Sequence, residues 1–72
     1  MKELETMTIL VKTYPGTGRP SSFEVVNDDD LERIEYLEEA WGYSVVDTGL
    51  PADIDPWEEY TTTDPDGFVQ WK

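Results

Sequence analysis

The chain has 72 residues, with 17 Asp and Glu against 5 Lys and Arg, and its formal net charge at pH 7 is −12. A chain of this length forms one small domain, here taken as 1–72. It contains no Cys and no His, which excludes a disulfide framework and thiolate metal sites. Most proton-transfer and nucleophilic chemistry also lacks its usual side chains. We therefore expect a non-catalytic protein without a cofactor.

The apolar content bears on location and on folding. No apolar run approaches the roughly 20 residues of a membrane helix, and the charged start, Met1-Lys2-Glu3, is not typical of a signal peptide. We therefore expect a soluble, cytoplasmic protein that does not contact a membrane. Leu, Ile, Val and Phe supply 16 of the 72 residues, just above the level at which strongly charged chains stay disordered. A folded domain of modest stability is predicted.

The first third of the chain has the pattern of a strand hairpin. Residues 6–14 (TMTILVKTY) are rich in β-branched side chains and alternate in polarity, as a strand does. The next segment, 15–20, contains two Pro and two Gly and breaks the chain. Residues 21–26 (SSFEVV) predict a second strand, so a hairpin with a long loop is expected.

An amphipathic helix is predicted over 29–41. Its apolar residues recur at three- and four-residue steps, at Leu31, Ile34, Leu37 and Trp41. An Asp at the start suits an N-cap, and Gly42 suits the position just after the helix. We expect Trp41 to pack against the rest of the domain.

The remaining elements are shorter. We expect a connector at 48–54. We also expect the Trp71 side chain to pack against the rest of the domain. The expected fold class is α+β, an antiparallel sheet of four to five strands with one amphipathic helix across it, in the order ββαβ followed by a C-terminal hairpin. The predicted pieces are a strand at 43–47, one helical turn at 55–58 with Asp55 as cap, and strands at 60–63 and 68–71 around a type I turn at 64–67.

The sequence does not favour a metal or phosphate site. Asp53 with Asp55, like Asp64 with Asp66, has the spacing that hard cations use, but a calcium loop counted from Asp53 meets no Gly at its sixth position. Cap and turn roles explain these acids better. The glycines of 16–18 lack the Lys-Ser/Thr of a phosphate loop. Direct binding of nucleic acid is not expected, because the five cations are scattered.

The negative charge is concentrated in one part of the chain. Residues 1–26 carry three acids and three bases, whereas 27–72 carry fourteen acids and two bases, which accounts for the whole net charge. Concentrated like charge costs stability through self-repulsion, so it indicates a function. Adaptation to high salt, as in halophiles, is an alternative explanation of the acidity. The neutral first third of the chain disfavours it.

The predicted helix places a row of carboxylates on one side, away from its apolar stripe: Asp28, Glu32, Glu35 and Glu39. Such a row matches the phosphates of a nucleic-acid strand in charge and rough spacing, so a cationic groove would accept it. The alternative is an ordinary solvated face. A second acidic cluster surrounds Trp57, which either fills the core or anchors an interface. The predicted partner-binding residues are Asp28, Asp29, Asp30, Glu32, Glu35, Glu39, Asp53, Asp55, Trp57, Glu58 and Glu59.

In size, acidity, absence of His and Cys, and one acidic helix on a short sheet, the chain resembles phage-encoded inhibitors of bacterial defence nucleases, the anti-CRISPR and anti-restriction proteins. The resemblance implies a stoichiometric inhibitor in the bacterial host cytoplasm. Its partner would be a CRISPR–Cas nucleoprotein complex or another basic nucleic-acid-binding protein, whose DNA- or RNA-binding site it occupies. The alternative is a small adaptor that binds a protein through Trp57 and Tyr60.

Overall fold

The computed structural model describes residues 5–72. The segment Met1-Lys2-Glu3, on which the signal-peptide expectation depends, lies outside the described residues. Within residues 5–72, no helix is long and apolar enough to cross a membrane. The elements in chain order are β1 (Thr6–Thr13), β2 (Pro20–Asn27), α1 (Leu31–Ala40), β3 (Ser44–Pro51), α2 (Pro56–Tyr60), β4 (Thr61–Thr63) and β5 (Val69–Trp71).

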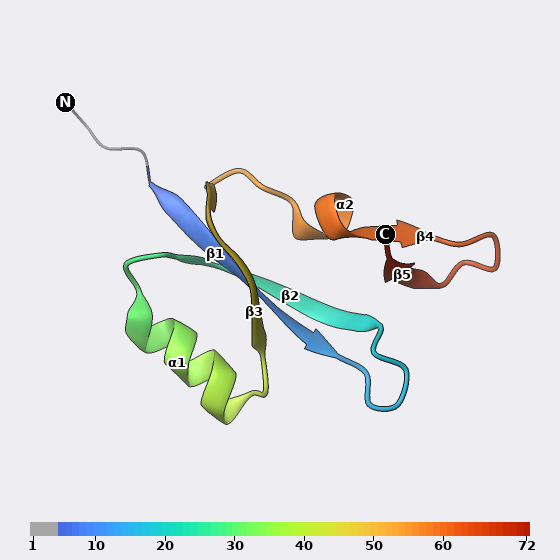
Figure 1. Ribbon diagram of the computed structural model, residues 1–72, viewed down its shortest axis with the longest axis horizontal. Coiled ribbons are helices and arrows are strands. Elements are labelled where there is room, and N and C mark those ends of the chain that lie inside the picture. Colours follow the sequence, from blue (N-terminus) through green and yellow to red (C-terminus); the bar gives the residue numbers. More distant parts are fainter. Residues whose placement is uncertain (1–4) are drawn as a thin grey trace.

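The described strands form two sheets. β1 lies in the centre of a three-stranded antiparallel sheet, in the order β2-β1-β3, and β4 pairs with β5 in a separate two-stranded sheet. The α+β class is therefore confirmed, but the strands do not join into one sheet of four to five. The C-terminal hairpin instead follows α2 and lies to one side of the larger sheet (Figure 1).

The central strand is buried on both faces. Ile9 and Leu10 are neighbours in β1 and both are 0% exposed, although successive strand residues point to opposite faces. Leu10 packs with Val26 and Leu37, so α1 covers its face. Figure 1 shows α1 and the C-terminal hairpin on opposite sides of the three-stranded sheet. These two covering layers explain how so short a chain buries the middle of one strand on both faces.

The ends of α1 follow from its capping residues. The Asp30 side chain accepts a hydrogen bond from the Arg33 N–H at 3.2 Å, which makes Asp30 the N-cap. After the helix, Gly42 adopts a positive φ of 73°, and the Tyr43 N–H reaches the Leu37 carbonyl at 3.0 Å. The positive φ favours Gly because it has no Cβ. The predicted caps are confirmed, and the helix is shorter than 29–41 because the chain before Leu31 forms a turn.

Only the middle of the predicted apolar stripe packs. Leu37 is 3% exposed and Ile34 is half-buried, but Leu31 is 67% exposed. The expectation that Trp41 is packed is wrong, because this side chain is 51% exposed. Its ring lies beside Tyr36 at the end of the helix, with centroids 6.5 Å apart. The helix thus contacts the sheet at its centre, and its apolar ends reach beyond that contact.

β3 is longer than predicted and includes the first part of the expected connector. It pairs with β1 from Val11–Ser44 to Thr6–Pro51, with two irregularities in the register. Gly49 has a φ of 73°, and β-bulges accommodate such residues without ending a strand. Pro51 stands at the strand end on the sheet edge, where a missing N–H costs little. For these reasons the Gly and Pro do not break the strand.

An aromatic cluster joins the C-terminal segment to the sheet. The Phe23 ring of β2 lies edge-on to Trp57 at 4.8 Å and to Trp71 at 5.7 Å, and it stacks with Tyr60 at 6.4 Å. The Trp71 indole N–H donates to the Gly18 carbonyl at 2.8 Å. Trp71 therefore packs in part, but it remains 38% exposed. Burial of Phe23 by these rings explains why the hairpin lies over the sheet instead of extending its edge.

Candidate functional site: an acidic helix face and an aromatic cleft

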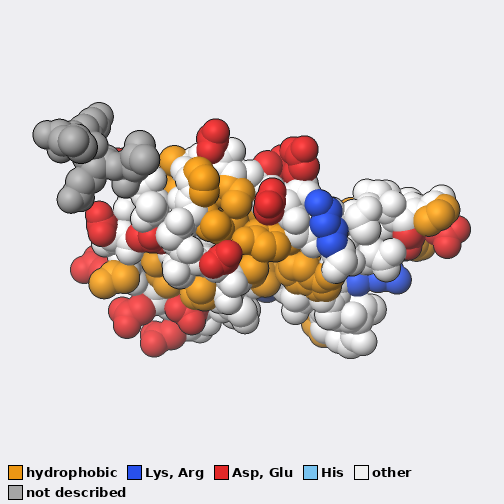
Figure 2. Space-filling view, turned by 45° about the horizontal axis from the view of Figure 1, so that its top comes forward, with side chains coloured by type: hydrophobic (Ala, Val, Ile, Leu, Met, Phe, Trp, Pro, Cys, Tyr) orange, Lys and Arg blue, Asp and Glu red, His pale blue; other side chains and the backbone are white. Residues whose placement is uncertain are grey.

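The outer face of α1 carries three aligned carboxylates, which we call the acidic face: Glu32, Glu35 and Glu39. All three are exposed. At 100° per residue they fall within about 60° of one another, opposite the side on which Leu37 and Ile34 meet the sheet. In Figure 2, acidic side chains gather at the lower left, the side where Figure 1 places α1, and further acidic side chains lie at the left edge, the upper centre and the right end of that view. Three of the four carboxylates of the predicted row therefore align on α1, and the fourth, Asp28, lies before the helix.

Asp28 is used inside the fold. Its carboxylate accepts hydrogen bonds from the hydroxyls of Thr6 and Thr8, the latter at 2.5 Å, and from the Gly49 N–H at 3.2 Å. The Thr6 bond first, then the Thr8 bond, lower the pKa of Asp28 from its ordinary 3.8. The carboxylate thus joins β1 and β3 to the turn before α1. We no longer assign Asp28 to partner binding.

The two residues after Asp28 have different roles. Asp29 is exposed, and its backbone N–H donates to the Asn27 side chain at 2.9 Å. Asp30 caps α1 with one carboxylate oxygen but is exposed. Both acids are exposed near the start of α1, outside the acidic face formed by Glu32, Glu35 and Glu39.

The second predicted acidic cluster lies elsewhere. Asp55 caps α2, with its side chain accepting from the Trp57 N–H at 3.1 Å. Asp53, Glu58 and Glu59 are exposed. Figure 1 shows α2 on the other side of the three-stranded sheet from α1. The structure therefore does not bring the two acidic clusters together into one surface.

Cations of this chain lie over aromatic rings. Arg33 of α1 lies 5.9 Å from the Tyr36 ring centroid, Lys12 lies 5.8 Å from that of Trp41, and Arg19 lies 5.0 Å from that of Phe68. Such contacts favour the cation through the ring's negative face. On α1, the pairing of Arg33 with Tyr36 places the positive charge beside the acidic face and not within it.

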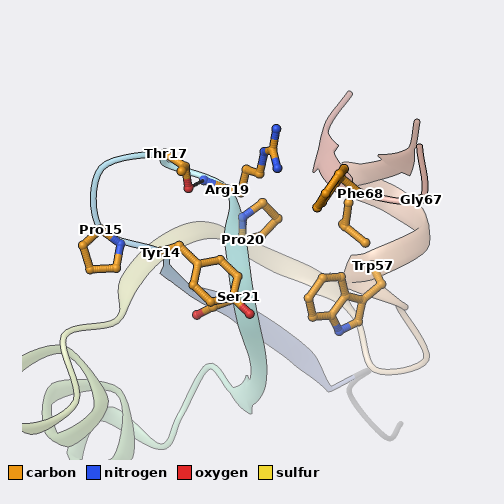
Figure 3. A pocket seen from close by; sticks show the side chains of 10 residues that line it. Tyr14, Pro15, Thr17, Arg19, Pro20, Ser21, Trp57, Gly67 and Phe68 are labelled. Atoms are coloured by element: carbon orange, nitrogen blue, oxygen red, sulfur yellow. Dashed lines mark hydrogen bonds between the residues drawn. The ribbon is translucent and has the colours of Figure 1, made fainter. Parts of the chain in front are cut away.

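A second surface is a cleft of about 600 Å³, which we call the aromatic cleft (Figure 3). In Figure 3, Tyr14 and Pro15 lie on one side, Trp57 and Phe68 on the other, and Pro20 between them. Its volume is within the range of ligand-binding pockets. The lining residues are Tyr14, Pro15, Thr17, Arg19, Pro20, Ser21, Trp57, Gly67, Phe68 and Val69.

Backbone hydrogen bonds hold both walls of the aromatic cleft. In the β1–β2 loop, the Tyr14 N–H donates to the Arg19 carbonyl at 2.9 Å. In the opposite turn, one Asp64 oxygen accepts from Asp66 N–H at 3.0 Å and Phe68 N–H at 2.9 Å. The predicted turn role of Asp64 is confirmed. Sequence analysis found Trp57 but missed the cleft, for which aromatic residues flanking two separate turns were the available signal.

Tyr60 lies outside the cleft lining and links α2 to β3. Its hydroxyl donates to the Asp47 carboxylate at 3.3 Å. Burial raises the pKa of Tyr60 above its ordinary 10.0, and the charge of Asp47 raises it further. This side chain therefore supports the fold, and of the two residues proposed for an adaptor only Trp57 lines the cleft.

Metal sites and relatives add no further assignment. Among residues 5–72 no group of three or more acidic side chains is arranged to hold a metal ion. No protein-family model matches the chain, and no curated protein or solved structure matches it either.

Proposed function

We propose that this protein is a non-catalytic inhibitor that occupies the basic nucleic-acid-binding surface of a CRISPR–Cas or other bacterial defence complex. The observation that carries the proposal is the alignment of Glu32, Glu35 and Glu39 on the outer side of α1, all exposed. A cationic groove attracts such a surface over a long range, and its Lys and Arg side chains pair with the carboxylates at close range.

The spacing of the acidic face suits this role. Residues 32–39 of a helix rise by about 10 Å, so the three carboxylates recur about every 5 Å along the axis. One strand of B-DNA carries a phosphate about every 3.4 Å. The linear charge density of the acidic face is thus within a factor of about two of that of a DNA strand. Because the carboxylates stand on a helix that is already capped at both ends, little ordering is needed on binding.

Charge reversal on α1 tests the proposal. We predict that the triple variant Glu32→Lys, Glu35→Lys and Glu39→Lys loses capture of the cationic complex from nuclease-treated bacterial lysate and no longer blocks target-DNA binding by that complex in a gel shift. The loss should be about a hundredfold or more, because three attractions become three repulsions. Circular dichroism should show that the fold is kept, since all three side chains are exposed.

A matched variant separates local surface from total charge. Asp53→Lys, Glu58→Lys and Glu59→Lys change the net charge by the same six units, but these exposed residues belong to the α2 side of the sheet. We expect this variant to keep most of its inhibition. Equal loss in both triple variants, or full inhibition by the α1 variant, contradicts the assignment to the acidic face.

A second candidate function, a small adaptor, is favoured by a different observation. Trp57, the residue proposed for it from the sequence, lines a preformed cleft and remains 38% exposed. Half-exposed Trp side chains in clefts are frequent anchors of protein interfaces. This second function uses the other side of the sheet, so it does not compete with the acidic face for the same surface.

A further inference from the structure

We propose that the aromatic cleft binds an extended, proline-rich peptide segment with basic residues beside the prolines. The proposal rests on the second candidate function and is independent of the acidic inhibitor. It commits to one chemistry of partner because the cleft combines exposed aromatic rings and hydrogen-bond donors on a strongly acidic chain.

The rings of the cleft are presented to solvent. Phe68 is 55% exposed, Tyr14 is 56% exposed and Trp57 is 38% exposed. They come from three separate parts of the chain, the β1–β2 loop, α2 and the β4–β5 turn. Flat rings converging on one groove are the surface on which proline rings of a polyproline II helix pack. Pro20 adds a rigid apolar surface between the rings, and Pro15 adds one beside Tyr14 (Figure 3).

The polar groups of the cleft suit such a peptide. A polyproline II segment makes no internal hydrogen bonds, so its carbonyls need outside donors. Tyr14 and Arg19 are among the lining residues, and the hydroxyl of one and the guanidinium of the other can donate hydrogen bonds. Arg19 is held over the Phe68 ring at 5.0 Å, which fixes its position beside the apolar wall.

The negative charge of the chain determines which residues should flank the prolines of the peptide. Glu58 directly follows the lining residue Trp57, and Asp66 directly precedes the lining residue Gly67; both acids are exposed. With a net charge of −12 on the chain, a peptide bearing Lys or Arg is attracted and a nucleic acid is repelled. A second copy of the chain is disfavoured for the same reason. The charged residue of the lining itself is Arg19, whose guanidinium is engaged by the Phe68 ring at 5.0 Å. The overall charge of the chain therefore favours basic residues on the flanks of the peptide, outside the cleft.

The cleft is largely formed before binding. The loop wall is closed by the bond from Tyr14 to Arg19, and the Trp71 indole ties the same loop to β5 through the Gly18 carbonyl at 2.8 Å. A rigid site loses little conformational entropy on binding, and a polyproline II ligand also loses little. Both partners therefore meet in nearly their bound shapes.

The experiment uses the full chain and a synthetic peptide with a hexaproline centre and an arginine pair at each end. Binding is measured by tryptophan fluorescence and mapped by amide chemical shifts in NMR. We expect saturable binding with shifts at Tyr14, Arg19 and Phe68. Replacing the arginines by glutamates, or the prolines by glycines, should each weaken binding by about tenfold or more.

Protein variants locate the binding. Phe68→Ala and Tyr14→Ala should each weaken peptide binding by about tenfold. Tyr36→Ala is the control, because Tyr36 is likewise 50% exposed and lies beside an arginine, but on α1; it should bind as the natural sequence does. Thermal unfolding checks that all three fold.

The variants distinguish peptide binding in the aromatic cleft from inhibition through the acidic face. The charge-reversed α1 variant should still bind the peptide, and Phe68→Ala should still inhibit the defence complex. The proposal is overturned if the arginine-flanked peptide does not bind, if the glycine or glutamate versions bind equally well, or if Phe68→Ala binds like Tyr36→Ala.

Discussion

At the scale of single residues, Asp28 shows how one carboxylate of an acid-rich chain differs from its neighbours. It stands beside Asp29 and Asp30 in the sequence, yet it accepts hydrogen bonds from two threonines and one backbone N–H on β1 and β3. The two neighbouring acids are exposed. One member of the three-acid run therefore stabilises the fold, and the other two are available to a partner.

This difference predicts a specific dependence on pH. The pKa of Asp28 is lowered in the folded state from 3.8, so its contribution to stability is present above about pH 4 and is lost as pH falls through the lowered folded-state value. We predict that Asp28→Asn lowers the thermal midpoint at pH 7 and unfolds with a weaker pH dependence below about pH 4. Circular dichroism melts over a pH series measure both effects.

Asp29→Asn is the matched control for this prediction. It removes the same charge one residue away, and the bond from its backbone to Asn27 does not involve the carboxylate. The control should melt close to the natural sequence at pH 7 and retain its acid dependence. Identical melts for the two variants contradict the structural role of Asp28.

At the scale of elements, α1 is attached to the sheet through the centre of its apolar stripe. Leu37 is 3% exposed and packs with Leu10 and Val26, whereas Leu31 on the same stripe is 67% exposed. We predict that Leu37→Ala lowers the free energy of unfolding by about 2–4 kcal/mol. The same substitution at Leu31 should change it by no more than about 0.5 kcal/mol.

Urea unfolding followed by circular dichroism measures this pair of variants. The comparison keeps the substitution, the helix and the side-chain type constant, so only burial differs. Equal destabilisation by the two variants would mean that α1 is held along its whole stripe, contrary to the packing described above.

The elements also show which features of the fold follow from local sequence. Caps at Asp30 and Asp55, the turn at Asp64 and the end of α1 at Gly42 were all predictable, because each depends on a few neighbouring residues. The full length of β3 was not, since its pairing with β1 absorbs Gly49 and Pro51 through register irregularities. Hydrophobicity alone also misjudged Trp41, because burial depends on how far the sheet extends beneath the helix.

The candidate site also has features that local sequence predicts and features that it does not. Helical periodicity alone placed Glu32, Glu35 and Glu39 on one face, and this alignment is found. Helical periodicity does not place α2 relative to α1, so it could not separate the second acidic cluster from the first. The aromatic cleft unites residues from 14–21 with residues from 57–69. The aromatic residues beside each turn are visible in the sequence, but nothing local shows that the two turns meet.

At the scale of the whole molecule, the net charge of −12 acts on stability and on binding with opposite signs. Like charges repel across a molecule whose radius of gyration is 13.4 Å, and the screening length is about 10 Å at 0.1 M salt and about 30 Å at 0.01 M. Salt therefore weakens the repulsion within the folded chain. It weakens the attraction of the acidic face to a cationic partner as well.

We predict that the thermal midpoint rises between 0.01 M and 0.5 M NaCl, while affinity for the cationic defence complex falls over the same range. Both charge-reversed triple variants reduce the net charge from −12 to −6, so both should show a smaller rise in midpoint. Only the α1 variant should lose binding at every salt concentration. A midpoint that falls with salt would indicate that attractive ion pairs outweigh repulsion, and the excess charge would then stabilise the fold without any partner.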